Sequence, residues 1–310
     1  MKTNRKTLEE RTDEIALGKL FVVVWEQKIT VIVVSLIFAF AASIYAISIP
    51  NQYTATVVLA PSQSESGGLS GALGQLGGLA SLAGVNIGSN ESSEAQIAQQ
   101  IMISWDFIDK FIRKNKLEKE IYAVDGWDSE SNLLVLNERL YDVANKSWAI
   151  KDNDILRAPT SWELYKAFRE MLNVVEDKKT GLVSVSIEYY SPLLAKAWLD
   201  MYLKSINIHM QQRQIVKVTR NIAYLEKQIE KTSIAEMQGV FYTIIEGQIK
   251  SKMLAEASPD YAFATVNPSM VPEEKSQPQR ALLVILCAIF GAILSLAWVL
   301  IKYSLEVRSS

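Results

Sequence analysis

Two long apolar runs without a charged side chain lie near the two ends of this 310-residue chain. Residues 29–49 and residues 281–301 form runs of 21 residues each, and neither run contains Asp, Glu, Lys or Arg. A helix of that length measures roughly 31 Å, which matches the hydrocarbon thickness of a bilayer. The backbone in lipid has no water to bond with, so such a run must be helical. We therefore predict two transmembrane helices, with residues 50–280 attached to the membrane at both ends.

Basic residues near the two runs predict the orientation of the chain. Residues 1–28 carry six Lys or Arg side chains, and residues 302–310 carry two. Because Lys and Arg are enriched on the cytoplasmic side of membrane helices, we expect both terminal segments to be cytoplasmic and residues 50–280 to lie on the far side. The tripeptide at 46–48 resembles a signal-peptide cleavage site, but a run this long after 28 residues favours an uncleaved anchor.

Small residues recur along one face of each apolar run. Cys287, Gly291 and Ser295 are spaced by four residues in the second run, and Ala42 and Ala46 have the same spacing in the first. Such a stripe lets another helix approach closely, so it favours helix association within an oligomer. Small residues are also common in membrane helices generally, and the pattern does not separate these two interpretations.

The composition argues against several classes of site. The net charge is −2, without the basic excess of a nucleic-acid-binding protein. Cys287 is the only cysteine and His209 the only histidine, which excludes an internal disulfide and leaves His209 as a surface or packing residue. The acids at 125–130 lack the spacing of a calcium loop, and the Gly-rich stretch lacks the lysine of a phosphate-binding loop. We expect no catalytic residue, cofactor or metal.

The segment between the apolar runs alternates between strand-like and helix-like patterns, which predicts a mixed α+β fold. A Gly- and Leu-rich stretch at 62–89 is either a linker or an apolar loop that covers a surface. Trp127 and Trp148 are expected in the core. The predicted strands are 52–59, 173–175, 183–187 and 261–266, and the predicted shorter helices are 90–116 and 161–172. The first and last strands both adjoin a membrane run, so we expect them in one sheet.

The longest predicted helix begins at Ser191, a typical cap, followed by Pro192 at the first helical position. Residues 192–231 would form a rod of about 60 Å. A seven-residue apolar repeat predicts that this rod packs on a partner helix, either a returning helix at 233–256 or another subunit. The candidate seam consists of Ile208, Ile215, Val218, Ile222, Leu225 and Ile229. The returning helix would present Ile234, Met237, Phe241, Ile244 and Gln248 on one face. Together they form a helical extension at 192–257.

The stretch before the second apolar run carries a family resemblance. Its features are Tyr261-Ala262-Phe263, then Pro268, Pro272, Pro278 and Arg280, and then Gly291 within the apolar run. This pattern resembles the closing segment of the bacterial polysaccharide chain-length determinants, also called polysaccharide co-polymerases. Gln279 departs from the basic residue usual before Arg280. Independently of the family, prolines stiffen an extended approach to the membrane, and an arginine suits its boundary.

The resemblance implies a periplasmic α/β base domain beside the bacterial inner membrane, with a long helical, coiled-coil-like extension. It also implies a homo-oligomeric ring. Some members carry a cytoplasmic tyrosine kinase after the second membrane helix. Only nine residues follow residue 301 here, and no Walker-type loop is found, so we expect any kinase to be a separate chain.

The resemblance further implies a function without catalysis. The chain would regulate the length of a surface polysaccharide, with lipopolysaccharide O-antigen as the first expectation. Its partners would be further copies of itself, the membrane, the polysaccharide polymerase and the lipid-linked polysaccharide. The alternatives are a co-polymerase for exopolysaccharide or capsule, and a two-span periplasmic sensor. A sensor would need a cytoplasmic output domain, which residues 1–28 and 302–310 are too short to form.

Overall fold

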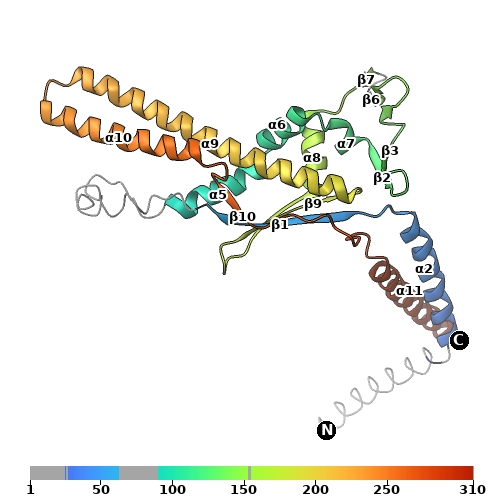
Figure 1. The fold of residues 1–310 in the computed structure, drawn as a ribbon. Helices are drawn as coiled ribbons and strands as arrows, with labels where there is room; N and C mark the ends of the chain where they lie inside the picture. Colours follow the sequence, from blue (N-terminus) through green and yellow to red (C-terminus); the bar gives the residue numbers. More distant parts are fainter. Residues whose placement is uncertain (1–24, 26, 63–89, 153–154, 310) are drawn as a thin grey trace, which may run out of the picture. The chain divides into compact units, whose positions relative to one another are not determined.

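The computed structural model describes all residues except 1–24, 26, 63–89, 153–154 and 310 (Figure 1). The predicted stretch 62–89 therefore lies, apart from Ser62, outside the described residues. The chain divides into two compact units, one formed by residues 1–51 and 276–310 and the other by residues 52–275. Each unit is described separately below.

The first unit is a pair of helices, α2 (Lys28–Ser48) and α11 (Arg280–Ser309). Ala42 and Ala46 of α2 and Ser295 of α11 are buried between them, whereas large apolar side chains such as Phe40 and Trp298 are exposed. Within the described part of the chain, α2 and residues Arg280–Val299 are long and apolar enough to cross a membrane. Helix α11 continues beyond the predicted end at residue 301, because helical hydrogen bonds persist into its polar C-terminal turns.

The second unit is built on a four-stranded antiparallel sheet with the order β10-β1-β9-β8. Side chains along β9 alternate between buried and half-buried, as its sequence predicts. The first and last strands, β1 and β10, are neighbours, which confirms their predicted pairing in one sheet. The bounds are β1 (Tyr53–Pro61), β8 (Leu172–Glu176), β9 (Val183–Tyr189) and β10 (Phe263–Asn267).

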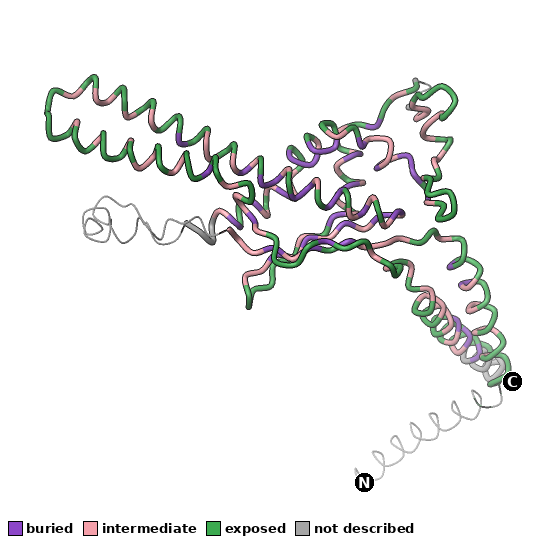
Figure 2. The backbone as a smooth tube through the Cα atoms, in the orientation of Figure 1, coloured by how far each residue is buried: buried purple, intermediate pink, exposed green. Residues whose placement is uncertain are grey.

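Helices pack on this sheet and enclose an aromatic core (Figure 2). The N-terminal half of α9 lies against β1 and β9 and buries Trp198 and Tyr202. Phe111 and Phe168 stack on Tyr202, with ring centroids 4.8 and 5.4 Å away. The helices are α5 (Asn90–Met102), α6 (Trp105–Asn115), α7 (Glu118–Tyr122), α8 (Ser161–Met171) and α9 (Pro192–Lys231).

The single helix predicted at 90–116 is wrong, because the structure divides it into α5 and α6. Ser104 caps α6, and its hydroxyl oxygen accepts a hydrogen bond from the backbone N–H of Phe107. The hydroxyl of Tyr202 donates to the carbonyl of Met102, which satisfies the end of α5. A serine inside an apolar stripe was the available signal, because its side chain competes with the helical hydrogen bonds.

Three short hairpins fill residues 124–157, and sequence analysis missed them. Trp127 and Trp148, expected in the core, are only half-buried. The indole N–H of Trp127 donates to Asn132 of its own hairpin, and the Trp127 ring meets Tyr53 of β1 edge to face. Trp148 packs on Tyr141 of its own hairpin and on Tyr122 of α7. The strands are β2 (Val124–Asp128), β3 (Leu133–Leu136), β4 (Tyr141–Asp142), β5 (Ser147–Trp148), β6 (Ile150–Asp152) and β7 (Ile155–Arg157).

Helix α9 is followed by α10 (Ala235–Ala257), which returns along it as an antiparallel hairpin (Figure 1). The sequence left open whether α9 packs on a returning helix or on another subunit. The structure contains the returning helix. The predicted face of α10 is partly wrong, since Phe241 and Gln248 are half-buried but Met237 and Ile244 are exposed. Gln238 and Ile245 are half-buried instead, so the covered stripe differs from the prediction at these two positions and agrees with it at Phe241 and Gln248.

Candidate functional site

No group of three or more His, Cys, Asp or Glu side chains that could hold a metal occurs among the residues the structure describes. The candidate functional features are therefore surfaces and contacts that position the chain. They comprise the paired apolar helices, the segment that leads into α11, and the α9–α10 hairpin.

Gly291 allows the apolar helices to approach closely. A Cβ atom added there would lie 2.9 Å from both Cβ and Cγ of Phe38 on α2, which is closer than van der Waals contact permits. The rings of Phe38 and Phe290 meet edge to face, with centroids 6.4 Å apart. The small residues Ala42, Ala46, Gly291 and Ser295 are thus used for contact within one chain, and Cys287 is half-buried beside them.

Arg280 connects the start of α11 to the residues that follow the end of α2. It is the first residue of α11, and its guanidinium donates to the side-chain oxygen of Asn51, just after α2, at 3.0 Å. Of the predicted prolines, Pro268 is exposed, while Pro272 and Pro278 are half-buried. Ser269 follows Pro268, is buried, and donates its hydroxyl hydrogen to Asp200 of α9. Sequence analysis did not single out Ser269.

Asn207 of α9 holds the last strand of the sheet. Its side-chain oxygen accepts from the backbone N–H groups of Ala262 and Phe263 at 3.0 and 2.9 Å, and its amide donates to the Phe263 carbonyl at 3.0 Å. Asn207 is itself buried, between Ile206 and Met210 on the covered side of the helix. A polar residue within an apolar helical stripe was a signal that sequence analysis overlooked.

The six candidate seam residues do not all lie on the covered face of α9. In the N-terminal half, the buried residues repeat with the helical period, and Ile208 falls outside them with 37% of its surface exposed. In the C-terminal half, Val218 is buried, and the other four seam residues are half-buried. The seven-residue repeat therefore predicts the covered face only beyond residue 210. The four half-buried residues are Ile215, Ile222, Leu225 and Ile229.

Two glutamine side chains form hydrogen bonds that link α9 and α10. Gln211, which interrupts the apolar pattern, donates to the carbonyls of Ala255 and Ser258 at 2.9 and 3.2 Å. At the far end, Gln238 donates to the carbonyls of Thr232 and Ile229 at 2.8 and 3.4 Å. These bonds satisfy backbone groups at the ends of α9 and α10, so the hairpin is closed at both ends.

The outer surface of the hairpin carries large apolar side chains among its charged ones. Large apolar side chains on it are exposed, and no described part of the chain covers them. An uncovered apolar surface of this kind is characteristic of an interaction site. Its residues are Val216, Tyr224, Ile234, Met237, Val240, Tyr242, Ile244, Ile249, Met253 and Leu254.

His209 packs on Phe107, with ring centroids 5.3 Å apart and the rings near perpendicular. Burial, followed by the nearby charge of Lys110, lowers the pKa of its imidazole. This half-buried ring is a packing residue, in agreement with the sequence.

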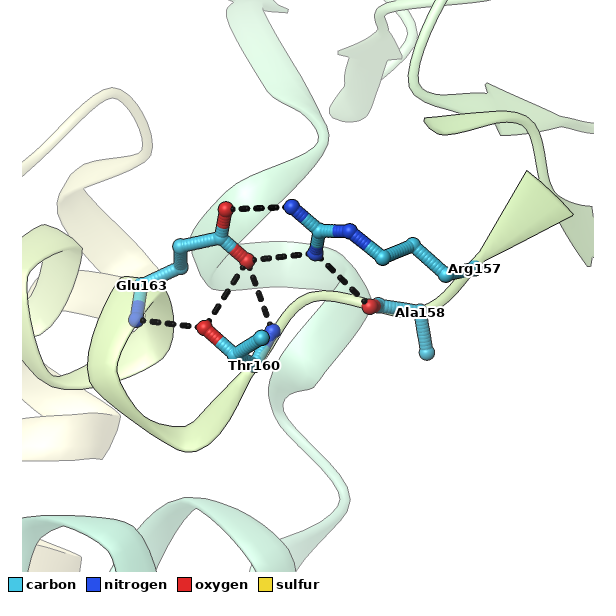
Figure 3. A network of polar contacts seen from close by, with 4 residues as sticks. All are labelled: Arg157, Ala158, Thr160 and Glu163. Carbon is cyan, nitrogen blue, oxygen red and sulfur yellow. Dashed lines mark hydrogen bonds and ion pairs between the residues drawn. The ribbon is translucent and has the colours of Figure 1, made fainter. Parts of the chain in front are cut away.

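A polar network joins the end of the short hairpins to α8 (Figure 3). The Arg157 guanidinium donates to both carboxylate oxygens of Glu163 at 2.7 and 2.8 Å. The same carboxylate accepts from the backbone N–H of Thr160 at 2.7 Å, and the Thr160 hydroxyl caps the helix. The hydrogen bonds from Arg157 and then from the Thr160 backbone lower the pKa of Glu163 to about 2. Sequence analysis predicted the start of this helix at residue 161, where the structure has it, but missed this network.

Comparison with known proteins identifies the N-terminal third of the chain. Residues 13–115 match the family model described as Wzz, chain length determinant protein. This third of the chain is therefore similar to the chain length determinant family. This match confirms the family resemblance, and it does so over a region outside the proline-rich segment that first indicated it. No curated protein matches the sequence.

Solved structures similar to the chain include three co-polymerases. A full-length bacterial polysaccharide co-polymerase is 12% identical with a TM-score of 0.43, covering 92% of this chain and 97% of that one. A fragment of WzzB, a polysaccharide co-polymerase from Salmonella Typhimurium, is 13% identical with a TM-score of 0.33, covering 73% and 100%. A mutant of the Shigella flexneri lipopolysaccharide O-antigen chain-length regulator WzzBSF is 8% identical with a TM-score of 0.29, also covering 73% and 100%.

Proposed function

We propose that this chain is a non-enzymatic regulator of surface polysaccharide length, and that the polysaccharide is lipopolysaccharide O-antigen. The observation that carries the proposal is the chain length determinant match over residues 13–115, which includes the first apolar helix and reaches into the core of the second unit. The described part of the fold contributes surfaces for contact. The chain would act as a scaffold beside the membrane polymerase and its lipid-linked product.

The proposed location is the bacterial inner membrane, with residues 52–275 in the periplasm. The exposed apolar surface of α2 and α11 would face lipid, and the basic residues of 1–28 would remain in the cytoplasm. A reporter enzyme that is active only in the periplasm tests this orientation when fused at Thr180, in the exposed turn between β8 and β9. Activity is expected there, with none for a fusion at the N-terminal end; the reverse pattern would contradict the orientation.

The proposed assembly is a homo-oligomer, with a ring as the expected form. Its support is the exposed apolar surface of the α9–α10 hairpin, which a second copy of the same hairpin would cover. The seam residues beyond residue 210 are covered within the hairpin, so contacts between subunits would involve the outer hairpin surface more than the seam itself.

Deletion of the gene in its native host tests the function. On a lipopolysaccharide gel, the O-antigen bands are expected to lose their preferred length, and the full chain supplied in trans should restore it. An unchanged ladder together with altered secreted exopolysaccharide or capsule would support the alternative polymer. An unchanged length distribution for every surface polysaccharide would overturn the proposal.

A further inference from the structure

A basic and aromatic hollow lies where the β4–β5 hairpin meets α6, α7 and the segment before α8. Its volume is about 380 Å³. The charged side chains that line it are four cations and two carboxylates: Arg113, Lys116, Lys119, Lys146, Glu118 and Glu120. The membrane helices and the α9–α10 hairpin contribute nothing to it.

Two of these cations have no ion-pair partner among the described residues, and the carboxylate of Glu118 in the same lining has none there either. Arg113 pairs with Asp109 at 3.0 Å, and Lys119 pairs with Glu120 at 3.3 Å. Lys116 and Lys146 form no ion pair within the described part of the chain. The hollow therefore offers two ammonium groups to a bound anion.

The backbone at both lysines adopts a conformation that glycine or asparagine would adopt more easily. Lys116 has φ 56° at the end of α6, and Lys146 has φ 51° in the turn between β4 and β5. Left-handed positions at helix ends and in tight turns ordinarily carry glycine or asparagine. Lysine at both positions raises the backbone energy, and no ion pair in the described chain compensates for it. Such unfavourable conformations are concentrated at functional sites.

Aromatic rings form one wall of the hollow. Tyr141 and Trp148 belong to the β4–β5 hairpin, meet edge to face with centroids 5.3 Å apart, and are both half-buried. Tyr122 supports Trp148 from α7, with centroids 6.4 Å apart. A wall of partly exposed rings beside cations suits a ligand that has both apolar ring faces and negative charge.

The Arg157 network holds another part of the lining in place. Ala158 and Pro159 line the hollow, and the Ala158 carbonyl accepts from the Arg157 guanidinium at 3.2 Å (Figure 3). The pairing of Arg157 with Glu163 fixes this segment to the start of α8. The segment that carries Ala158 and Pro159 is thus held by hydrogen bonds before any ligand binds.

We propose that this hollow binds a segment of an anionic glycan, whose sugar rings pack on Tyr141 and Trp148 and whose carboxylate or phosphate groups pair with Lys116 and Lys146. That this glycan is the surface polysaccharide whose length the chain regulates rests on the proposed function. A second hollow, of about 570 Å³ beside α9, has Asp200, Glu256 and Asp260 in its lining and Lys204 as the cation there, so it would repel such a ligand.

Calorimetric titration of the full chain in detergent micelles with a galacturonic acid oligosaccharide tests the proposal. A neutral dextran oligosaccharide of equal length and inorganic phosphate serve as comparison ligands. The double variant Lys116→Asn, Lys146→Asn removes both charges and keeps residues that tolerate the left-handed conformation. Its affinity for the uronic acid oligosaccharide is expected to fall at least about tenfold, because two charge-assisted contacts are lost, without a lower thermal midpoint.

The matched control is Lys178→Asn, Lys179→Asn in the exposed turn between β8 and β9, which removes the same charge and should bind as the wild type does. Equal affinity of the hollow variant and the wild type would overturn the site, as would absence of binding to the wild type. Equal binding of dextran would overturn the role of charge, and equal binding of phosphate would overturn the role of the rings. The gene deletion tests the proposed function separately, because binding in micelles does not depend on polymer length in the cell.

Discussion

The buried amide of Asn207 makes three hydrogen bonds to the backbone of Ala262 and Phe263, and so joins α9 to the strand that closes the sheet. Asn207→Leu would leave those backbone groups without partners in the core. We expect a loss of about 2–4 kcal/mol in the free energy of unfolding, measured by denaturant titration. Asn221→Leu is the matched control, because Asn221 is an exposed residue of the same helix. Equal effects of the two variants would contradict the role of Asn207.

The Glu163 carboxylate predicts a pH dependence of stability. Its pKa in the folded chain is about 2, below its ordinary value of 4.5, so folding favours the ionised form. The stabilisation is therefore complete above pH 4.5 and is lost as the pH falls toward 2. We expect a contribution of about 1–2 kcal/mol, reduced by solvent because the pair is partly exposed.

Glu163→Gln tests this pH dependence. Thermal unfolding between pH 2 and pH 6 should show a smaller slope for the variant than for the wild type. Glu130→Gln, in an exposed turn, should retain the slope of the wild type. If the stability of the Glu163 variant depends on pH as strongly as that of the wild type, other carboxylates account for the pH dependence.

At the scale of the elements, the α2–α11 contact depends on the space at Gly291. Gly291→Leu should separate the helices and lower stability in detergent by about 1–3 kcal/mol, because the added atoms would overlap the Phe38 side chain. Ala297→Leu enlarges an exposed residue of the same helix and should have little effect. The midpoints of thermal unfolding in micelles compare the two variants. Equal midpoints would mean that α11 moves to make room for the leucine without losing stability.

The α9–α10 hairpin offers a second test at this scale, with two valines of the same helix. Val218 is 1% exposed, whereas Val216 is 46% exposed. Val218→Asp would place an unpaired carboxylate against α10 and should increase hydrogen exchange of the α10 amides, while Val216→Asp should not. Protected α10 amides in the Val218 variant would show that α10 is held by other contacts.

Sequence patterns predicted the elements whose stabilising contacts are local or periodic. Ser191 and Pro192 marked the start of α9 because capping depends on a few adjacent residues, and β9 was evident from its alternation. The break at Ser104 was missed because the apolar stripe continues across it. The face of α9 that covers the sheet was missed because it depends on where β1, β9 and β10 lie, which the seven-residue repeat does not encode. The hollow near Lys116 combines residues from four separate segments, so no local pattern indicates it.

At the scale of the whole molecule, the hairpin exposes apolar residues along both helices, and these would be covered when copies of the chain associate. The double variant Tyr242→Ser, Met253→Ser removes two large members of this surface. Neither residue is on the side that faces α9, so the fold of one chain should be retained. We expect a smaller particle mass by multi-angle light scattering in detergent, with an unchanged circular dichroism spectrum.

The matched control for the assembly is Thr243→Ser, Lys250→Ser, two exposed positions of the same helix that carry no large apolar side chain. It should leave the particle mass unchanged, because the polar positions add little apolar area to a contact between copies. If the Tyr242, Met253 variant also keeps the mass of the wild type, the copies associate through another surface. Expression of both variants in the deletion host then connects assembly to function. If length control requires the oligomer, the first variant should broaden the O-antigen distribution, and the control should restore the preferred length.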